Sequence, residues 1–173
     1  MKSIILLSGP VGAGKTTVAR ELIACSAGPM VCIGGDTFWA HIIRRSEQLP
    51  PHKNFRMIMT AMVAAALPYA LYGYETLLDF SIPPWFLETA DKVVSGKEVP
   101  VDYVVLRPTE NICAARCVGR AEGIINDYTP YHDLYADFND VSRRHLIVND
   151  QADATAVARQ IREGLDEGKF RML

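Results

Sequence analysis

The sequence predicts an α/β fold, in which a five-stranded parallel sheet carries helices on both faces. Short apolar segments rich in β-branched residues alternate with helical segments along the whole chain. Consecutive strands are separated by segments that can hold the crossover helix that parallel pairing requires. The chain of 173 residues has the length of one domain, and no repeat or linker divides it. We therefore expect a single domain over residues 1–173.

The expected elements follow from the apolar patterns in chain order. Strands are expected at residues 3–8, 30–34, 75–80, 101–106 and 145–148. Helices are expected at about residues 14–25, 37–47, 54–72, 84–95, 109–121 and 152–168. Between them, residues 48–53 contain a proline pair, and residues 122–133 contain Gly123 and Pro130 without an apolar period. These two segments are expected to be irregular.

The composition argues against partners that require a strongly basic surface. Hydrophobic residues make up 49% of the chain, charged residues make up 22%, and the net charge is −2. A weakly acidic chain lacks the broad positive field that attracts long nucleic acids or anionic membranes, although a local basic patch would be compatible with it. We therefore expect neither a nucleic-acid nor a membrane partner, and no obligate protein partner is indicated.

Two apolar segments have the character of targeting or membrane sequences but are too short. The apolar run at the amino terminus stops at Ser8, before it reaches the length of a signal-peptide core. Residues 57–72 are apolar almost all round, but they contain Thr60 and Pro68 and fall short of the about 20 residues that span a bilayer. A buried core helix and a cytoplasmic location are the expectations.

The cysteines are scattered along the chain, at Cys25, Cys32, Cys113 and Cys117. They form no Cys-x-x-Cys pair and have no histidine at zinc-site spacing. Cys113 and Cys117 are four residues apart on an expected helix, where two ordinary buried positions are a simpler interpretation than a pair of metal ligands. We expect reduced thiols.

The clearest motif is the segment GPVGAGKT at residues 9–16, which matches G-x-x-x-x-G-K-[ST] in full and lies between an expected strand and an expected helix. Its glycines let successive backbone N–H groups point into one concavity, to which the following helix adds the positive end of its dipole. Lys15 is expected to reach the β and γ phosphates, and the Thr16 hydroxyl to bind Mg²⁺. The expected nucleotide-binding residues of this loop are Gly9, Gly12, Ala13, Gly14, Lys15, Thr16 and Thr17.

The residues at and after Asp79 discriminate between the classes of protein that contain such a phosphate-binding loop. Asp79 ends the third expected strand and is the expected Mg²⁺ ligand beside Thr16. Phe80 follows it, where a motor ATPase would carry a water-activating glutamate, and the Asn-Lys-x-Asp guanine signature is absent from the sequence. Residues 79–83 read DFSIP rather than the Asp-Gly-x-Pro-Arg of nucleotide monophosphate kinases. These features favour ATP and Mg²⁺ as ligands, and disfavour motor ATPases and monophosphate kinases.

Asp36 directly follows the second expected strand, in the segment GGDTFW at residues 34–39. Ligands of open α/β sheets bind at the carboxyl edge of the strands, so this carboxylate is expected next to the phosphate-binding loop. There it could orient an acceptor hydroxyl and accept its proton. The alternative role is a helix N-cap, which aspartate fills well, and the two roles are compatible.

In chain order these motifs resemble the small P-loop kinases of the shikimate kinase, gluconate kinase, chloramphenicol phosphotransferase and zeta-toxin group. The resemblance covers nearly the whole chain, and its motifs are specific for the nucleotide half. It implies a three-layer P-loop NTPase sandwich with the strand order 2-3-1-4-5. It also implies that Asp36 contacts the acceptor hydroxyl, that residues 37–72 build the acceptor pocket, and that a lid at about residues 120–133 closes over the nucleotide.

The resemblance further implies arginines that reach the nucleotide from the lid, for which the chain offers Arg107, Arg116 and Arg120. Arg116 and Arg120 are four residues apart and are expected on one face of a helix. Adenine contact is implied for Arg116 and phosphate contact for Arg120. An exposed charged helix face is the alternative interpretation of this pair.

The acceptor-binding candidates lie in the segment after Asp36. They are His41, Arg44, Arg45, Asn54 and Arg56. Each is alternatively a solvated surface residue, and Asn54 and Arg56 are favoured because they open a very apolar helix. Together with Asp36, we take Arg44, Asn54 and Arg56 as the expected acceptor-binding residues.

The sequence thus predicts a phosphotransferase that moves the γ-phosphate of ATP to a hydroxyl of a small molecule, with Lys15, Asp36 and Arg120 as catalytic residues. Three alternatives stay open: an NTPase that hydrolyses without an acceptor, a nucleotide-gated regulatory protein, and a polynucleotide 5′-hydroxyl kinase. The acceptor is not identified, because the segments expected to form its pocket carry little motif content.

Overall fold

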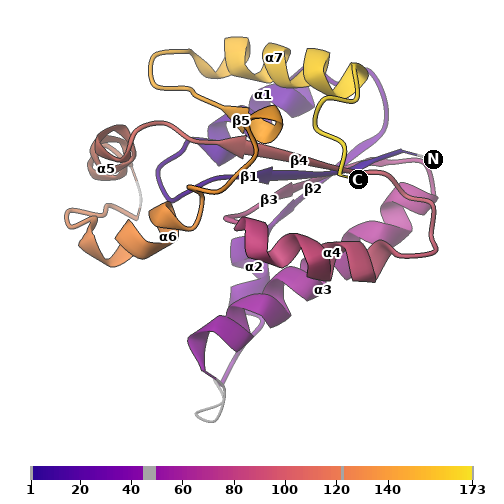
Figure 1. Cartoon of the computed structure of the whole chain (residues 1–173), viewed down its shortest axis with the longest axis horizontal. Coiled ribbons are helices and arrows are strands. Elements are labelled where there is room, and N and C mark those ends of the chain that lie inside the picture. The colour runs from indigo at the N-terminus through magenta and orange to yellow at the C-terminus, as the bar shows by residue number, and fades with distance from the viewer. Residues whose placement is uncertain (1, 45–49, 122, 173) are drawn as a thin grey trace.

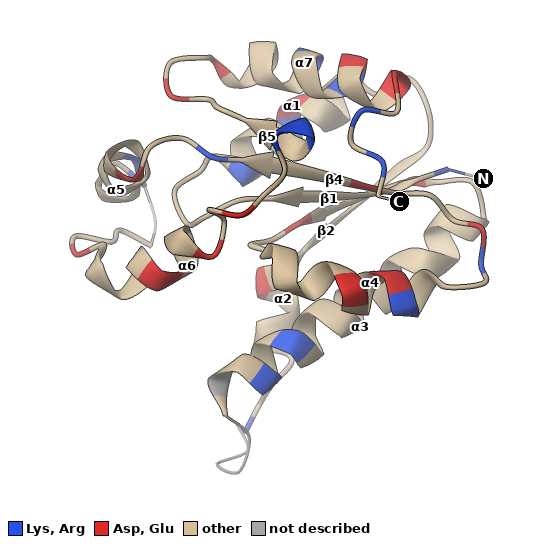
Figure 2. Ribbon diagram, in the orientation of Figure 1, with Lys and Arg blue, Asp and Glu red and all other residues tan. Residues whose placement is uncertain are grey.

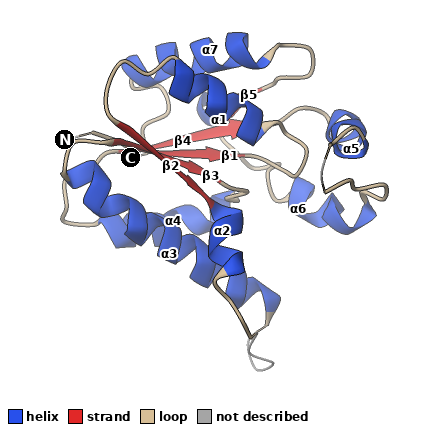
Figure 3. Cartoon of the chain, turned by 180° about the vertical axis from the view of Figure 1, so that it is seen from behind, coloured by secondary structure: helices blue, strands red, loops and turns tan. Residues whose placement is uncertain are grey.

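Five parallel strands form the centre of the molecule (Figures 1 and 3). The computed structural model describes residues 2–44, 50–121 and 123–172. The strands are β1 (Ile4–Ser8), β2 (Met30–Gly34), β3 (Glu75–Asp79), β4 (Val101–Leu106) and β5 (Leu146–Ile147). Their order in the sheet is β2-β3-β1-β4-β5, and every neighbouring pair is parallel. The predicted fold class and strand order are therefore confirmed.

Helices cover both faces of this sheet. They are α1 (Lys15–Ala24), α2 (Gly35–Ala40), α3 (Pro51–Leu71), α4 (Leu87–Val94), α5 (Glu110–Val118), α6 (His132–Ala136) and α7 (Ala154–Asp166). Short 3₁₀ helices lie at η1 (Pro84–Phe86), η2 (Thr129–Tyr131) and η3 (Arg143–His145). Helices α1 and α7 cover one face and helices α3 and α4 the other, while α5 and α6 lie beyond the carboxyl ends of the strands (Figure 1).

The central strand β1 shows how one sequence pattern supplies both cores. Its side chains alternate between the faces, so Ile4 and Leu6 pack toward α3 and α4, whereas Ile5 and Leu7 pack toward α1 and α7. All four are fully buried. A continuous apolar strand of this kind is typical of a parallel sheet covered on both sides.

Helix α3 is the apolar segment that was expected in the core. Met59, Met62, Val63 and Ala66 are buried against the sheet and α4. Within the described residues, the stretch His52–Leu71 is also the one helix whose length and composition would allow it to cross a membrane. Only 33% of this stretch is buried, so α3 packs one face against the core and exposes Met57, Tyr69 and Leu71 on the other side.

Several elements differ from the sequence prediction. Helix α3 begins at Pro51 instead of about residue 54, because proline fits the first turn of a helix, so the end of the segment expected to be irregular is helical. Helix α2 ends at Ala40 instead of about residue 47, because the chain turns there and Ile42 packs back against the core; residues 45–49 lie outside the described part. Helix α5 ends at Val118 instead of about residue 121, with Gly119 as its C-cap. The segment expected to be an irregular lid contains η2 and leads directly into the unpredicted helix α6.

Candidate active site

The phosphate-binding loop connects β1 to α1 at the carboxyl edge of the sheet. Gly9, Gly12 and Gly14 have positive φ angles of 139°, 82° and 93°. At Gly12 the constraint is also steric, because a Cβ atom would lie 2.3 Å from the carbonyl oxygen of Cys113. This close approach lets the loop lie directly on α5. Only glycine combines that conformation with that contact.

The amino end of α1 is open to a ligand. Gly14 is its N-cap, and among the described residues no side chain caps the helix. The first backbone N–H groups of a helix have no partner within the helix, so those of Lys15, Thr16 and Thr17 are available to an anion. Gly12, Gly14 and these three residues line the cavity described below, whereas Gly9 and Ala13 do not.

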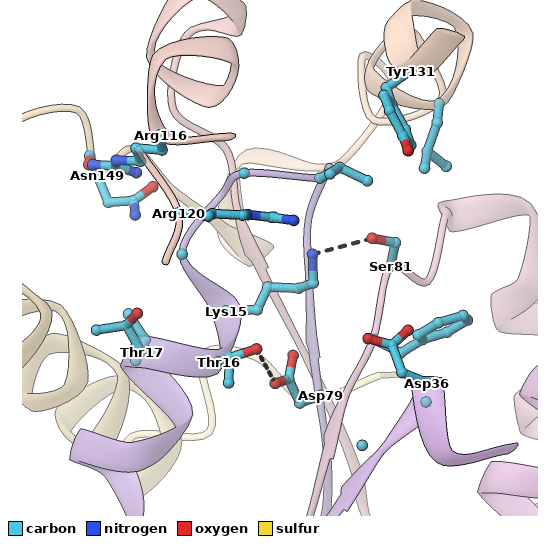
Figure 4. A pocket seen from close by; sticks show the side chains of 18 of the residues that line it. Lys15, Thr16, Thr17, Asp36, Asp79, Ser81, Arg116, Arg120, Tyr131 and Asn149 are labelled. Atoms are coloured by element: carbon cyan, nitrogen blue, oxygen red, sulfur yellow. Dashed lines mark hydrogen bonds between the residues drawn. The ribbon is translucent and has the colours of Figure 1, made fainter. Parts of the chain in front are cut away.

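The Lys15 ammonium is enclosed by the loop itself. It donates hydrogen bonds to the carbonyl oxygens of Gly9 at 3.0 Å and Pro10 at 2.9 Å, and to the Ser81 hydroxyl at 3.1 Å (Figure 4). Burial lowers the pKa of Lys15 to about 8, and Asp79 opposes this effect in part. A lysine held in this way gains most from a ligand that brings negative charge to it.

Thr16 and Asp79 meet at the carboxyl end of β3. The Thr16 hydroxyl donates to the Asp79 carboxylate, with 2.7 Å between the oxygens (Figure 4). A hydroxyl and a carboxylate next to a phosphate-binding loop are the hard oxygen donors that Mg²⁺ prefers, so this pair fits the ion that the sequence implies. The residues described hold no group of three or more His, Cys, Asp or Glu side chains that could bind a metal.

Asp36 stands on the opposite side of the cavity from α1. It lies in the first turn of α2, whose N-cap is Gly34, so the alternative prediction that Asp36 is the N-cap is wrong. Gly35, the first residue of this helix, lies against the Phe80 ring, where a Cβ atom would lie 2.1 Å from a ring carbon. The Asp36 side chain is exposed, and its charge is close enough to raise the pKa of Lys15 slightly against the larger effect of burial.

The arginines of the predicted lid take three different positions. Arg116, on α5, donates to the carbonyl oxygens of Ala13 at 3.3 Å and Asn149 at 2.7 Å, and it lines the cavity. Arg120 also lines the cavity and extends over Lys15 (Figure 4). It lies beyond the end of α5, so the expectation that it shares a helical face with Arg116 is wrong. Arg107 stacks on the Tyr135 ring, 4.8 Å from its centre.

The other acceptor candidates that the structure describes lie outside the cavity. Arg44, Asn54 and Arg56 are absent from its lining, so the structure does not bring these three residues together with Asp36. The Arg56 guanidinium instead lies 5.0 Å from the centre of the Trp85 ring and donates to the Thr89 hydroxyl at 2.6 Å, which directs it toward α4. His41 is exposed, and Arg45 falls outside the described residues.

Three side chains that the sequence did not single out hold the site together. The Ser81 hydroxyl accepts the hydrogen bond from Lys15. The Asn149 amide, which is buried, donates to the Ala13 carbonyl at 2.9 Å. The Tyr128 hydroxyl donates to the Val11 carbonyl at 2.7 Å and so connects the lid to the loop. No local sequence motif marks any of the three.

Lys15, Thr16, Asp36, Asp79, Ser81, Arg116, Arg120 and Asn149 line one cavity of about 1050 Å³. This volume lies at the upper end of the roughly 300–1,000 Å³ that is usual for ligand sites. The wall around Asp36 is aromatic, with Trp39 of α2, Phe55 of α3 and Phe80 after β3. Ile125, Tyr131 and Leu134 line the cavity from residues 123–136.

The cysteines match the expectation of free thiols. Cys25 and Cys32 are exposed, and Cys113 and Cys117 are buried under the phosphate-binding loop. Burial raises the pKa of Cys113 to about 11, so this thiol stays protonated and unreactive at neutral pH.

Comparisons with known proteins agree with this architecture. The family model described as an AAA domain matches residues 4–128, and no curated protein matches the sequence. A sugar kinase from Janibacter sp. HTCC2649 has 15% identity and a TM-score of 0.73, covering 96% of this chain and 95% of its own. The Deinococcus radiodurans tunicamycin resistance protein has 16% identity and a TM-score of 0.73, covering 95% and 96%.

A third similar structure is the Mycobacterium tuberculosis APS kinase CysC in complex with AMPPNP and APS. It has 14% identity and a TM-score of 0.72, covering 95% of this chain and 98% of its own. At these identities the similarity concerns the fold, and it extends over at least 95% of each chain. The family model covers well over half of the sequence and includes the phosphate-binding loop, Asp36 and Asp79. This chain therefore belongs to the AAA domain family and has the fold of the small P-loop kinases.

Proposed function

We propose that this protein transfers the γ-phosphoryl group of ATP to a hydroxyl group of a small molecule. The observation that carries the proposal is that one cavity joins a phosphate-binding loop to a carboxylate on the opposite wall, Asp36. The similar APS kinase was solved with AMPPNP, an ATP analogue, which supports ATP as the donor. The similar sugar kinase supports a small hydroxylated acceptor.

The nucleotide half would hold the triphosphate by backbone and cationic groups. The N–H groups at the start of α1 bind phosphate oxygens, and the Lys15 ammonium exchanges its carbonyl partners for the β and γ phosphates. Arg120, which extends over Lys15, stabilises the charge on the transferred group, and Arg116 contacts the adenine. Thr16 and Asp79 would hold Mg²⁺, which when bound neutralises charge on the two outer phosphates.

The acceptor half would position and deprotonate the hydroxyl. Asp36 accepts the proton of the acceptor hydroxyl as its oxygen forms a bond to the γ phosphorus. The bond between that phosphorus and the oxygen that bridges to the β phosphate breaks, and ADP leaves with the electron pair. The products are ADP, the phosphate ester and a proton that passes from Asp36 to water.

The alternative of a polynucleotide acceptor receives less support from the charge distribution. Figure 2 shows Lys and Arg on several separate elements of the described chain, among them α3, α4 and α7, and Asp and Glu on α4, α6 and α7. Binding of a polynucleotide depends on basic residues gathered along one track. Free thiols in the described residues accord with a cytoplasmic location, which we include in the proposal.

The test replaces Asp36 with Asn and compares nucleotide binding with transfer. In Asp36→Asn, we expect ATP affinity by calorimetry to match the parent chain, and phosphotransfer to fall by about 10²- to 10⁴-fold, the usual contribution of a general base. The acceptor for this assay comes from an ADP-release screen over neutral, acidic and basic hydroxylated compounds. The matched control is Asp91→Asn, which removes an exposed carboxylate on α4 outside the cavity.

Two outcomes would overturn the proposal. Parent-level transfer in Asp36→Asn would remove Asp36 from the reaction. ADP release that no hydroxylated compound accelerates would show hydrolysis without transfer.

A further inference from the structure

We infer that the acceptor carries no anionic group and presents a planar ring to the protein, an inference that rests on the proposed function and narrows it to one substrate class. It follows from where the charges and the aromatic side chains of the cavity lie.

The cations of the cavity gather over the phosphate-binding loop. In the described lining they are Lys15, Arg116 and Arg120. Lys15 is held by loop carbonyls, and Arg116 is held by the carbonyls of Ala13 and Asn149. Arg120 lies close enough to Lys15 to lower the pKa of that lysine, as a second cation does. All three are therefore placed to meet the nucleotide rather than the acceptor.

The acceptor side carries negative charge of its own. Asp36 is the ionisable group on that wall within the described lining, and Asp79 lies at the end of the neighbouring strand. An anionic acceptor would meet Asp36 and the γ phosphate together, without a cation of its own. Burying an unpaired charge is costly, and like charges add repulsion.

The basic residues that would compensate an anionic acceptor point elsewhere. Arg56 is turned toward α4 by its contacts with Trp85 and Thr89. Arg44 and His41 are exposed and outside the described lining. Residues 37–72 were expected to supply the cations of the acceptor pocket. In the described structure, no Lys or Arg of this segment lines the wall around Asp36.

Aromatic rings fill the wall instead. The Phe55 ring lies 6.4 Å from that of Trp39 and 5.3 Å from that of Phe80, measured between ring centres. Phe80 is fixed by its contact with Gly35. From the lid, Tyr131 lies across the cavity from Asp36, with Ser81 between them in Figure 4. Aromatic faces bind planar rings by stacking, which is insensitive to the polar pattern of the ring edge.

The experiment uses two pairs of probes that vary ring and charge separately. They are methyl 4-(hydroxymethyl)benzoate and 4-(hydroxymethyl)benzoate, and glucose and gluconate. Saturation-transfer NMR and titration measure their binding to the full chain loaded with AMPPNP and Mg²⁺. We expect methyl 4-(hydroxymethyl)benzoate, the neutral ring compound, to bind at least about tenfold more tightly than 4-(hydroxymethyl)benzoate. The carboxylate would enter the cavity without a cation to pair with. Glucose and gluconate should bind more weakly than the neutral ring compound.

Variants of Trp39 test whether the aromatic wall causes the preference for a neutral ring. Trp39→Ala should weaken binding of the neutral ring compound by about 5- to 150-fold, the range for loss of one stacking partner, and Trp39→Phe should restore most of it. Tyr72→Ala, which removes an exposed aromatic ring at the end of α3, is the matched control and should have no effect. Unchanged AMPPNP affinity in Trp39→Ala shows that the variant is folded.

The outcomes separate the inference from the proposed function. Gluconate or the carboxylate binding as tightly as the neutral ring compound overturns the inference, as does equal binding by Trp39→Ala and Tyr72→Ala. A phosphate ester formed on gluconate, detected by ³¹P NMR, overturns the inference while supporting phosphotransfer. If none of the probes that bind changes the rate of ATP consumption, the proposed function is wrong. The relative affinities of the probes then still test whether the aromatic wall prefers a neutral ring.

Discussion

Single residues at the edge of the sheet set the chemistry of this site. The Lys15 ammonium donates hydrogen bonds to the carbonyls of Gly9 and Pro10 and to the Ser81 hydroxyl, so its hydrogen-bond partners are neutral groups. Asn149 and Arg116 both donate to the carbonyl of Ala13. These hydrogen bonds hold the loop at the Ala13 carbonyl, and its backbone N–H groups face the cavity. The loop is preorganised for an anion before any ligand arrives.

The depressed pKa of Lys15 predicts a pH dependence of nucleotide binding. Burial lowers its pKa to about 8 in the free protein, and a bound triphosphate must raise it again because negative charge favours the ammonium. Binding is then fully favourable below about pH 8. As the pH rises above that value, binding requires uptake of a proton, and affinity falls by up to about tenfold per pH unit.

Calorimetry in two buffers with different ionisation enthalpies checks this prediction. Proton uptake on ATP binding should be measurable near about pH 9 and absent near about pH 7. Lys15→Arg is the control, since arginine stays charged at both values and should bind without this proton uptake. Equal proton uptake in the two proteins would contradict the assignment to Lys15.

At the scale of elements, two connections shape the cavity. The segment from β3 to η1 is held by buried polar groups: the Ser8 hydroxyl donates to the Ile82 carbonyl and accepts from the Ile82 N–H, each at 2.8 Å. The Tyr103 hydroxyl donates to the same carbonyl at 2.7 Å. Two tyrosine hydroxyls hold the segment from the lid to α6, Tyr128 by donating to the Val11 carbonyl of the phosphate-binding loop and Tyr135 of α6 by donating to the carbonyl of Pro108.

Tyr128→Phe should loosen the part of the lid that lies over the phosphate-binding loop. The substitution removes one hydrogen bond, worth about 0.5–1.5 kcal/mol, so amide exchange of residues 123–131 should increase by about 2- to 10-fold. Hydrogen-exchange mass spectrometry of the free protein measures this change. Tyr135→Phe is the matched control, because its hydroxyl binds Pro108 outside the loop and should affect residues 132–136 instead. The same exchange pattern in both variants would show that the lid moves as one unit and would contradict separate attachment.

For the whole molecule, the site lies where elements far apart in the chain meet. The loop after β1, the start of α2, the end of β3, the end of α5 and the residue Asn149 after β5 all border one cavity. Nucleotide binding therefore joins both halves of the sheet. Ligands that bind only the folded state stabilise it in proportion to their occupancy.

The thermal stability of the chain should accordingly depend on ATP and Mg²⁺ together. ATP with Mg²⁺ at about 100 times its Kd adds about 2.7 kcal/mol, which raises Tm by roughly 5–10 °C for a chain of this size. Removal of Mg²⁺ by EDTA should reduce the shift. In Thr16→Ala, which lacks the hydroxyl next to Asp79, EDTA should change the shift less than in the parent chain. An EDTA effect of the same size in both proteins, measured by scanning calorimetry, would exclude Thr16 as a metal ligand.

The sequence by itself determined the sheet, its strand order through the family resemblance, and the place of the phosphate-binding loop and Asp79 at the carboxyl edge of the strands. These features depend on local signals. The apolar runs that form β1 and β4, the GPVGAGKT loop and Asp79 after β3 can each be read from a few consecutive residues. In a parallel sheet of known order, the carboxyl ends of neighbouring strands then bring such signals together at one edge.

Only the tertiary structure decided which side chains complete the site. Ser81 contacts Lys15 from 66 positions away, Tyr128 contacts Val11 from 117, and Asn149 contacts Ala13 from 136. Whether Arg56 faced the cavity was likewise settled by Trp85 and Thr89 of other elements. Such contacts depend on the paths of loops and on rotamers selected by neighbouring side chains. No periodicity or motif within a short window of sequence encodes them, because the partners become neighbours only when the chain has packed.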